Sequence, residues 1–343
     1  MASKEKEFVS GRGVFRQELY DAAESIELMA EDVEIDYVRL LDFAKEHAFS
    51  EVSLPKWDLP VFLEKADDAT LGFMILGNTQ NFAFTDFITK KKYFTDYEGS
   101  NYSGAMGMWA SLKKAIEKGV PLLDGGYLST ITYKELESIY NGKSKIPMLQ
   151  DRLEILNEVG DVLCKRYEGR FHNIVAGYEE GKARMFDNGK GFVERLISDF
   201  PSFRDESEYK GIKIRFEKRA QLAAGMIYEK FKGLGKKVFA EGEETKLSVF
   251  PDYELPKALR SIGIFKYSNK LQEEIDEGVP LKSGGNEEVE LRAATVYVAD
   301  LLEETIKHFN PGSKINQLWI DYLLWSAGRN SPGNSHLTIT TAY

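Results

Sequence analysis

The sequence contains very little cysteine and no long apolar run. Cys164 is the single cysteine among 343 residues, so an internal disulfide is impossible and a disulfide-stapled secreted scaffold is excluded. No stretch approaches the roughly 18 consecutive apolar residues of a membrane-spanning helix, and the first residues lack the apolar region of a signal peptide. These absences predict a soluble, cytoplasmic protein that does not associate with membranes.

An excess of basic residues is also missing. The chain has 45 Lys and Arg against 55 Asp and Glu, which gives a net charge of -10. Binding to a nucleic-acid backbone needs surplus positive charge. The composition therefore predicts no direct contact with nucleic acid, whereas 43% hydrophobic residues provide for a large core.

Several common catalytic motifs are absent. A phosphate-binding loop ending in Gly142-Lys143-Ser144 would need glycine at position 137, where the chain has Glu137. The four histidines show no zinc-binding spacing, and no Gly-x-Ser-x-Gly elbow is present. We therefore expect no zinc site, and we look for the chemistry among the carboxylates.

Apolar residues recur mainly with a helical period. This pattern predicts a mainly α fold with a small β element. We expect a chain of one compact unit with two parts, an N-terminal lobe over 1–150 and a helical body over 151–343. Helices are expected in the first fifty residues and over 149–167, 189–200, 217–232, 253–262, 287–308 and 315–327, and strands over 71–77, 210–216 and 336–341.

Two carboxylates stand out by their apolar surroundings. Asp321 is the only charge in the segment 315–325, so burial should raise its pKa unless a cation or several donors compensate. It is a candidate catalytic acid, or alternatively a structural partner of an arginine such as Arg292. Asp252 follows an apolar run just ahead of an expected helix, where it can cap the helix, serve catalysis, or do both.

Two further segments offer ligand-binding groups. Lys218 lies with neighbouring arginines at an expected helix start, which can hold a phosphate, although an ordinary solvated charged face is the alternative. Residues 81–84 form a compact aromatic turn, in which Asn81 could contact a base edge. Taken singly, none of these segments identifies a reaction.

Taken together and in order, the segments resemble the queuosine salvage family of queuosine 5′-phosphate N-glycosylases. The resemblance runs from about Asp67 to the last residue. The motifs that carry it are Asn81-Phe82-Ala83-Phe84, Gly119-Val120-Pro121, Tyr127-Leu128-Ser129-Thr130-Ile131-Thr132, Phe171-His172-Asn173, Phe200-Pro201-Ser202-Phe203-Arg204-Asp205, Lys218-Arg219-Ala220-Gln221, Phe250-Pro251-Asp252-Tyr253-Glu254-Leu255-Pro256, Gly263-Ile264-Phe265-Lys266-Tyr267-Ser268, Glu288-Val289-Glu290-Leu291-Arg292 and Leu318-Trp319-Ile320-Asp321-Tyr322-Leu323-Leu324-Trp325.

This resemblance implies a helical fold similar to DNA glycosylases. It also implies hydrolysis of the N-glycosidic bond of queuosine 5′-phosphate, which releases queuine for re-use in tRNA, with no metal and no cofactor. The substrate would be a small nucleotide, and we expect the protein to act as a monomer. The alternatives are an N-glycosylase of another modified nucleotide or nucleoside, and a non-catalytic relative that binds queuine.

The chain departs from the family pattern at several positions. Ala105-Met106 replaces a usual Tyr-Trp pair, Thr85 a usual Trp, and Gly225 an Asp that commonly follows the Lys-Arg-Ala-Gln turn. The usual His-Arg-rich tail here contains His336-Leu337-Thr338-Ile339. These changes concern base specificity and phosphate contacts.

The expected roles follow from the chemistry of the reaction. Breaking the bond builds positive charge on the sugar, which a carboxylate stabilises, and a 7-deazapurine needs help in leaving because it has no N7 to protonate. We assign Asp321 to the sugar or water and Asp252 to the base or its positively charged amine arm, an assignment that could be reversed. The expected substrate-binding residues are Lys218, Lys190 and Arg292 for the phosphate, Asn81 and Phe84 for the base, and Tyr253 beside Asp252.

Overall fold

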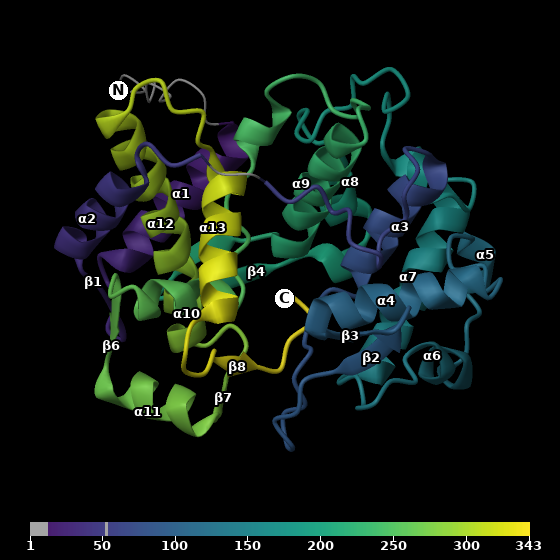
Figure 1. The fold of residues 1–343 in the computed structure, drawn as a ribbon, viewed down its shortest axis with the longest axis horizontal. Helices are drawn as coiled ribbons and strands as arrows, with labels where there is room; N and C mark the ends of the chain where they lie inside the picture. The colour runs from purple at the N-terminus through teal and green to yellow at the C-terminus, as the bar shows by residue number, and fades with distance from the viewer. Residues whose placement is uncertain (1–12, 52–53) are drawn as a thin grey trace.

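The computed structural model describes residues 13–51 and 54–343, which form thirteen α-helices and four short two-stranded sheets. Figure 1 shows the helices in two bodies that lie side by side, with the C-terminus between them. A mainly α fold with a small β element is therefore confirmed, while the likeness to DNA glycosylases stays a prediction. The helices are α1 (Val14–Glu27), α2 (Tyr37–His47), α3 (Asp68–Thr79), α4 (Gly104–Glu117), α5 (Gly125–Leu128), α6 (Tyr133–Ile139), α7 (Leu149–Arg166), α8 (Phe192–Asp199), α9 (Lys218–Gly233), α10 (Glu254–Ser261), α11 (Asn269–Glu277), α12 (Asn286–Phe309) and α13 (Gln317–Asn330).

The strands form local pairs. Three pairs are antiparallel, β1 with β6, β2 with β3 and β4 with β5, and the pair of β7 and β8 is parallel. Two predicted strand regions are confirmed, since 210–216 contains β5 and 336–341 contains β8, although they belong to different sheets. The strands are β1 (Val33–Ile35), β2 (Phe94–Tyr97), β3 (Ser100–Ser103), β4 (Glu206–Tyr209), β5 (Ile212–Arg215), β6 (Phe265–Tyr267), β7 (Pro280–Leu281) and β8 (Leu337–Thr338).

The predicted strand over 71–77 is wrong, because this segment lies inside helix α3. The side chain of Asp67 caps the helix by accepting a hydrogen bond from the backbone N–H of Thr70 at 2.9 Å. Ten of the twelve helical residues are buried, so the helix has no polar face to show a period of 3.6. An apolar run buried on all sides cannot be told from a buried strand by periodicity alone.

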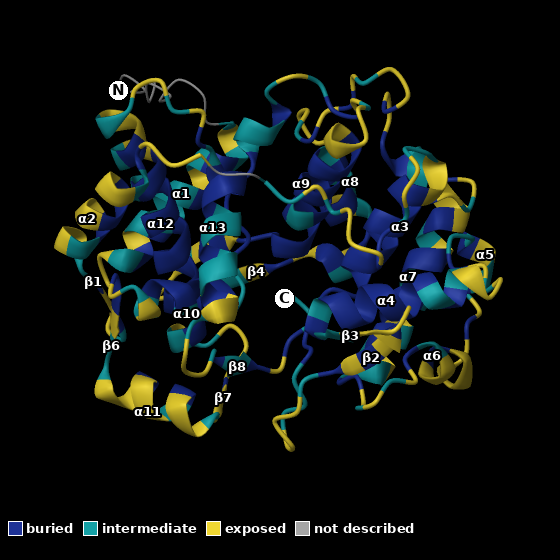
Figure 2. Cartoon of the chain, viewed as in Figure 1, coloured by how far each residue is buried: buried dark blue, intermediate teal, exposed yellow. Residues whose placement is uncertain are grey.

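The buried side chains divide into two hydrophobic cores (Figure 2). The first core is built mainly from α3, α4, α7, α8 and α9. The second combines the two ends of the described chain, since α1 and α2 pack with α10, α12 and α13. The first core includes residues from both sides of residue 150, and the division into a lobe over 1–150 and a body over 151–343 stays a prediction.

The two bodies approach closely where α9 meets α13. A Cβ atom added to Gly225 would lie 2.9 Å from the side chain of Leu318 and 2.9 Å from that of Phe250. Both distances are shorter than ordinary van der Waals contact, so a larger residue would push the bodies apart. Gly225 therefore allows the segment 249–252 and α13 to lie directly against α9.

A buried arginine of α7 fixes the segment 80–84. The guanidinium of Arg152 donates to the carbonyl oxygens of Gln80, Phe82 and Ala83, the last at 2.8 Å, and its side chain is completely buried. Backbone carbonyl groups in a loop have no helical partners, so these donors satisfy groups that burial would otherwise leave unpaired. The clamp places Asn81 and Phe84 on one wall of the gap between the bodies.

We predict that replacing this arginine is costly. Arg152→Met keeps the length of the side chain but leaves several buried carbonyl groups without donors, so the free energy of unfolding should fall by about 3 kcal/mol or more. Urea denaturation would measure the change. Arg166→Met on the same helix is the matched control, because Arg166 is 62% exposed and its ion pair with Asp199 should contribute less than about 1 kcal/mol. If the free energy of unfolding fell equally in the two variants, the role of Arg152 in fixing the segment 80–84 would be contradicted.

Candidate active site

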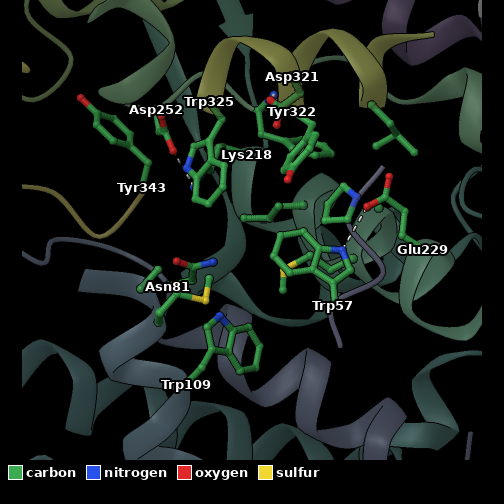
Figure 3. A pocket seen from close by; sticks show the side chains of 18 of the residues that line it. Trp57, Asn81, Trp109, Lys218, Glu229, Asp252, Asp321, Tyr322, Trp325 and Tyr343 are labelled. Atoms are coloured by element: carbon green, nitrogen blue, oxygen red, sulfur yellow. Dashed lines mark hydrogen bonds and ion pairs between the residues drawn. The ribbon is translucent and has the colours of Figure 1, made fainter. Parts of the chain in front are cut away.

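A cavity opens between the two bodies of the molecule (Figure 3). It has about 810 Å³ of empty space, which includes open solvent at its mouth. The walls come from α4, α9, α13 and loop segments of both bodies. The lining residues are Pro55, Trp57, Asn81, Phe84, Ala105, Met106, Trp109, Lys218, Leu222, Gly225, Met226, Glu229, Phe250, Asp252, Tyr253, Leu318, Asp321, Tyr322, Trp325 and Tyr343.

One face of helix α9 forms a wall of the cavity. The lining residues Lys218, Leu222, Gly225 and Glu229 follow one another at spacings of four, three and four residues. Such spacings keep side chains on one helical face. The wall therefore has a cation at one end and a carboxyl group at the other, three turns apart.

Asp321 projects from α13 into the cavity. Its Oδ1 accepts a hydrogen bond from the backbone N–H of Phe250 at 2.7 Å. Burial raises the pKa of this carboxyl to about 8, the Phe250 hydrogen bond lowers it, nearby Asp252 raises it, and Lys218 lowers it. Asp321 is therefore largely protonated near pH 7, with its second oxygen available to a ligand.

Asp252 is held at the end of an extended segment. The backbone N–H of Ser248 donates to Gln221, and the carbonyl of Pro251 accepts a hydrogen bond from Arg292 at 3.1 Å. Asp252 itself accepts from the backbone N–H of Glu254 at 2.8 Å, the first residue of α10. The expected helix-start contact is thus present, although Tyr253 occupies the N-cap position.

Lys218 lies beside Asp252. Its Nζ is 3.6 Å from Oδ2 of Asp252, and the side chain is 5% exposed. Burial lowers the pKa of the Lys218 ammonium, whereas Asp252 and Asp321 raise it. The backbone N–H of Lys218 donates to Asp205, so the start of α9 is fixed as well. Lys218 is the only lysine or arginine among the described residues that line the cavity.

The structure does not bring Arg292 to the cavity or to Asp321. Arg292 is completely buried beside the site and pairs with Asp205, at 2.5 Å, and with Glu288, at 3.3 Å. Its guanidinium lies 4.0 Å from the ring centre of Phe216 and 4.5 Å from that of Tyr343. Each nitrogen of its guanidinium donates to a group of the protein itself, so we remove it from the expected phosphate ligands and regard it as a positioning residue.

Lys190 also lies away from the cavity. It is exposed in the turn that precedes α8 and is not among the lining residues. We remove Lys190 from the expected phosphate ligands too.

The three remaining expected residues line the cavity. Asn81 donates to Asn78 at 3.2 Å and is 7% exposed. Phe84 contributes an apolar surface, and Tyr253 stands beside Asp252. Burial raises the pKa of the Tyr253 hydroxyl well above its usual value, so this group stays neutral. The geometry of these residues is compatible with the roles expected for them.

Sequence reasoning missed three cavity residues. Glu229 could have been noticed, because it lies in phase with Lys218 on the apolar face of the predicted helix 217–232. Trp57 lies in a segment without regular structure and gave no signal. Tyr343 reaches the cavity only because the tail returns between the bodies, where its carbonyl accepts a hydrogen bond from the backbone N–H of Ala83 at 3.1 Å.

Two features are absent from the part of the chain that the structure describes. No group of three or more His, Cys, Asp or Glu is placed to hold a metal ion. None of the described helices is both long and apolar enough to cross a membrane.

Comparison with known proteins now adds to this geometry. The family model described as queuosine salvage protein matches residues 61–341. The chain belongs to the queuosine salvage protein family. A relative from Sphaerobacter thermophilus, named queuosine 5′-phosphate N-glycosylase/hydrolase, is 32% identical over 317 residues, which cover 92% of this chain and 94% of the relative. A relative of the same name from Mus musculus is 30% identical over 271 residues, which cover 77% and 78%.

The positions that depart from the family pattern gather at the cavity. Ala105, Met106 and Gly225 all line it, and Thr85 lies in the adjoining hollow beyond Phe84. Aromatic surface is nevertheless present, because the cavity is also lined by Trp57, Trp109, Tyr322 and Trp325. The cavity wall is therefore aromatic although Ala105 and Met106 are not.

The raised pKa of Asp321 predicts how stability depends on pH. The unfolded chain releases this proton near pH 4 and the folded protein near pH 8, so the free energy of unfolding should fall with rising pH in this window. Asp321→Asn removes this titrating group. Between about pH 5 and pH 8, its free energy of unfolding should therefore rise relative to that of the parent protein by roughly 2 kcal/mol or more. Urea denaturation at both pH values measures this, with exposed Asp42→Asn as the control. A gain no larger than the control's would mean that Asp321 ionises normally.

Proposed function

We propose that this protein hydrolyses the N-glycosidic bond of queuosine 5′-phosphate and releases queuine and ribose 5-phosphate. The observation that carries the proposal is a cavity with two carboxyl groups in different surroundings, Asp252 beside Lys218 and Asp321 buried with a raised pKa. The names of the relatives from Sphaerobacter thermophilus and Mus musculus support it. In reactions of this kind, two acids in different environments usually divide the roles, so that one stabilises the developing charge and the other donates the proton.

Asp252 acts on the sugar side in this proposal. The ammonium group of Lys218 lies 3.6 Å from its Oδ2. An ionised carboxylate stabilises the positive charge that develops on the sugar as the bond to the base breaks. It also takes a proton from the water that attacks C1′.

Asp321 acts on the base side. Its carboxyl is largely protonated near pH 7, because burial raises its pKa to about 8. A neutral acid can donate its proton to an edge of the leaving base, which receives the electron pair of the broken bond. This reverses the roles that the sequence favoured, and the reversal rests on the cation that lies next to Asp252.

The remaining contacts complete the substrate site. Lys218 binds the 5′-phosphate, since it is the lysine of the cavity and opens helix α9. Asn81 and Phe84 line the base pocket on the opposite body, and Tyr253 packs beside Asp252. The protein is proposed to act as a cytoplasmic monomer on the free nucleotide rather than on tRNA, in keeping with its acidic composition.

Removing the sugar-side charge should slow the reaction strongly. We expect Asp252→Asn to reduce kcat about 10²–10³-fold on queuosine 5′-phosphate, because the amide cannot neutralise the sugar cation. Mass spectrometry of released queuine gives the rate, and thermal unfolding shows whether the fold survives. Exposed Asp42→Asn should keep the parent rate. Normal turnover by a folded Asp252→Asn protein would remove this residue from the mechanism.

The protonated state of Asp321 predicts the pH profile. Because the acid must hold its proton, kcat/KM should fall as pH rises above about 8, the value to which burial raises the pKa. Asp321→Asn should lose this basic limb and most of its activity. Glu229→Gln should retain the limb, although burial also raises the pKa of Glu229 to about 8. If the basic limb of the pH profile disappeared in Glu229→Gln and persisted in Asp321→Asn, the role of the acid would belong to Glu229.

A panel of substrates separates the alternatives. Release of a base from another modified nucleotide or nucleoside, with none from queuosine 5′-phosphate, would support an N-glycosylase of different specificity. Calorimetric binding of queuine without any turnover across the panel would support a non-catalytic relative. Each outcome contradicts the proposed reaction in a different way.

A further inference from the structure

Glu229 is a buried carboxylic acid at the far end of the cavity. It lines the cavity from α9 and is 7% exposed. Its only hydrogen bond within the described part of the chain comes from the indole N–H of Trp57, at 3.0 Å to Oε2. Figure 3 shows this pair on the side of the cavity away from Lys218 and Asp252. The other carboxylate oxygen, Oε1, has no hydrogen-bond donor from the described residues.

The surroundings of Glu229 lack a compensating cation. Burial raises the pKa of its carboxyl to about 8, the indole hydrogen bond lowers it, Asp321 on α13 raises it, and Lys232 on the same helix lowers it. Lys232 does not form an ion pair with Glu229. A buried acid without a cation is costly to ionise, and it gains most from a ligand that supplies a positive charge.

The charged groups follow an order along the cavity. Lys218 and Asp252 lie together at one end of the cavity. Asp321 lies between the ends, and Asp252 raises its pKa whereas Lys218 lowers it. At the other end, Asp321 is the acid that raises the pKa of Glu229. Figure 3 shows Asp252 on one side of the cavity, Glu229 on the other side and Asp321 between them. The order along the cavity is therefore Lys218 together with Asp252, then Asp321, then Glu229.

The proposed substrate has a matching order. Its phosphate is followed by the ribose, the 7-deazaguanine base and an arm at position 7 whose secondary amine is positively charged. With the phosphate at Lys218 and the base at Asp321, the arm extends toward Glu229. A phosphate, a sugar cation, a leaving base and an ammonium group each meet a group of suitable charge in this arrangement.

We propose that Glu229 binds the charged amine of the 7-substituent of the base, in a pocket whose wall is Trp57. The proposal rests on the proposed function, and it moves recognition of the amine from Asp252 to Glu229. Glu229 is here a specificity-determining residue rather than a group that acts on the bond. Ligands without a cationic arm leave the carboxyl group protonated and its oxygen Oε1 unused.

The wall of this pocket is built into the fold. The carbonyl of Trp57 accepts a hydrogen bond from Lys230 of α9 at 2.7 Å, and its ring packs edge-on against Phe62. The residue has a φ of 50°, which is an uncommon backbone conformation for a bulky side chain. These contacts hold the indole over Glu229, where its face can also pack against a cation or the apolar part of the arm.

The test compares two substrates that differ in the arm. One is queuosine 5′-phosphate, and the other is 7-deazaguanosine 5′-phosphate, which has the same sugar and base without the amine. Glu229→Gln keeps an acceptor for the indole but has no charge. We expect its kcat/KM to fall about 10–100-fold on queuosine 5′-phosphate, in line with loss of a charged hydrogen bond, and only a few-fold on the armless nucleotide.

Two control variants separate recognition from structure. Trp57→Phe removes the indole N–H and leaves Glu229 in place, so a purely structural role for the pair predicts that this variant is harmed and Glu229→Gln is not. Glu241→Gln changes a glutamate that is 95% exposed and should behave as the parent protein with both substrates. Thermal unfolding of every variant shows that the fold is retained.

Binding to the free bases gives a second measurement that needs no turnover. In calorimetry, the parent protein should bind queuine at least about 10-fold more tightly than 7-deazaguanine, and Glu229→Gln should lose this preference. An equal loss for both bases, or for both nucleotides, would overturn the role of Glu229. If the parent protein prefers queuine but cleaves neither nucleotide, the proposed hydrolysis fails while the recognition by Glu229 stands.

Discussion

The buried guanidinium of Arg292 is the interaction on which the geometry of the site depends. It pairs with Asp205, which in turn accepts the backbone N–H of Lys218. It also donates to the carbonyl of Pro251, the residue before Asp252, and its planar face lies over the ring of Tyr343. Three chain segments that are distant in sequence are thus joined to one rigid group, whose isolation from water makes each of these contacts costly to break.

The catalytic proposal follows from an uneven distribution of charge. One lysine serves the cavity, and it lies beside Asp252, so Asp321 and Glu229 have no equivalent compensation. Burial raises the pKa of Asp321 and that of Glu229 to about 8, so these two carboxyl groups can hold their protons near pH 7. This requires only differences in burial and neighbours.

Part of the helical fold could be predicted from the residues, since the helix near 149–167 has an exposed polar face that marks its period. The helices near 217–232 and 287–308 were also predicted, although most of their residues are buried. Helix α3 was mistaken for a strand because it is buried all round. Arg292 and Lys190 were selected as phosphate ligands from charge and resemblance, which contain no information on direction. Arg292 is occupied by protein acids and Lys190 remains at the surface.

By itself, the sequence determined the mainly helical class, the family and the principal acids, because period, composition and ordered motifs are local properties of the chain. Only the tertiary structure decided which acid lies beside the cation, that Glu229 faces the same cavity, and that Tyr343 returns to close it. These facts depend on packing between segments up to about three hundred residues apart. Such packing sets burial and distance, and burial and distance set the protonation of each carboxyl group.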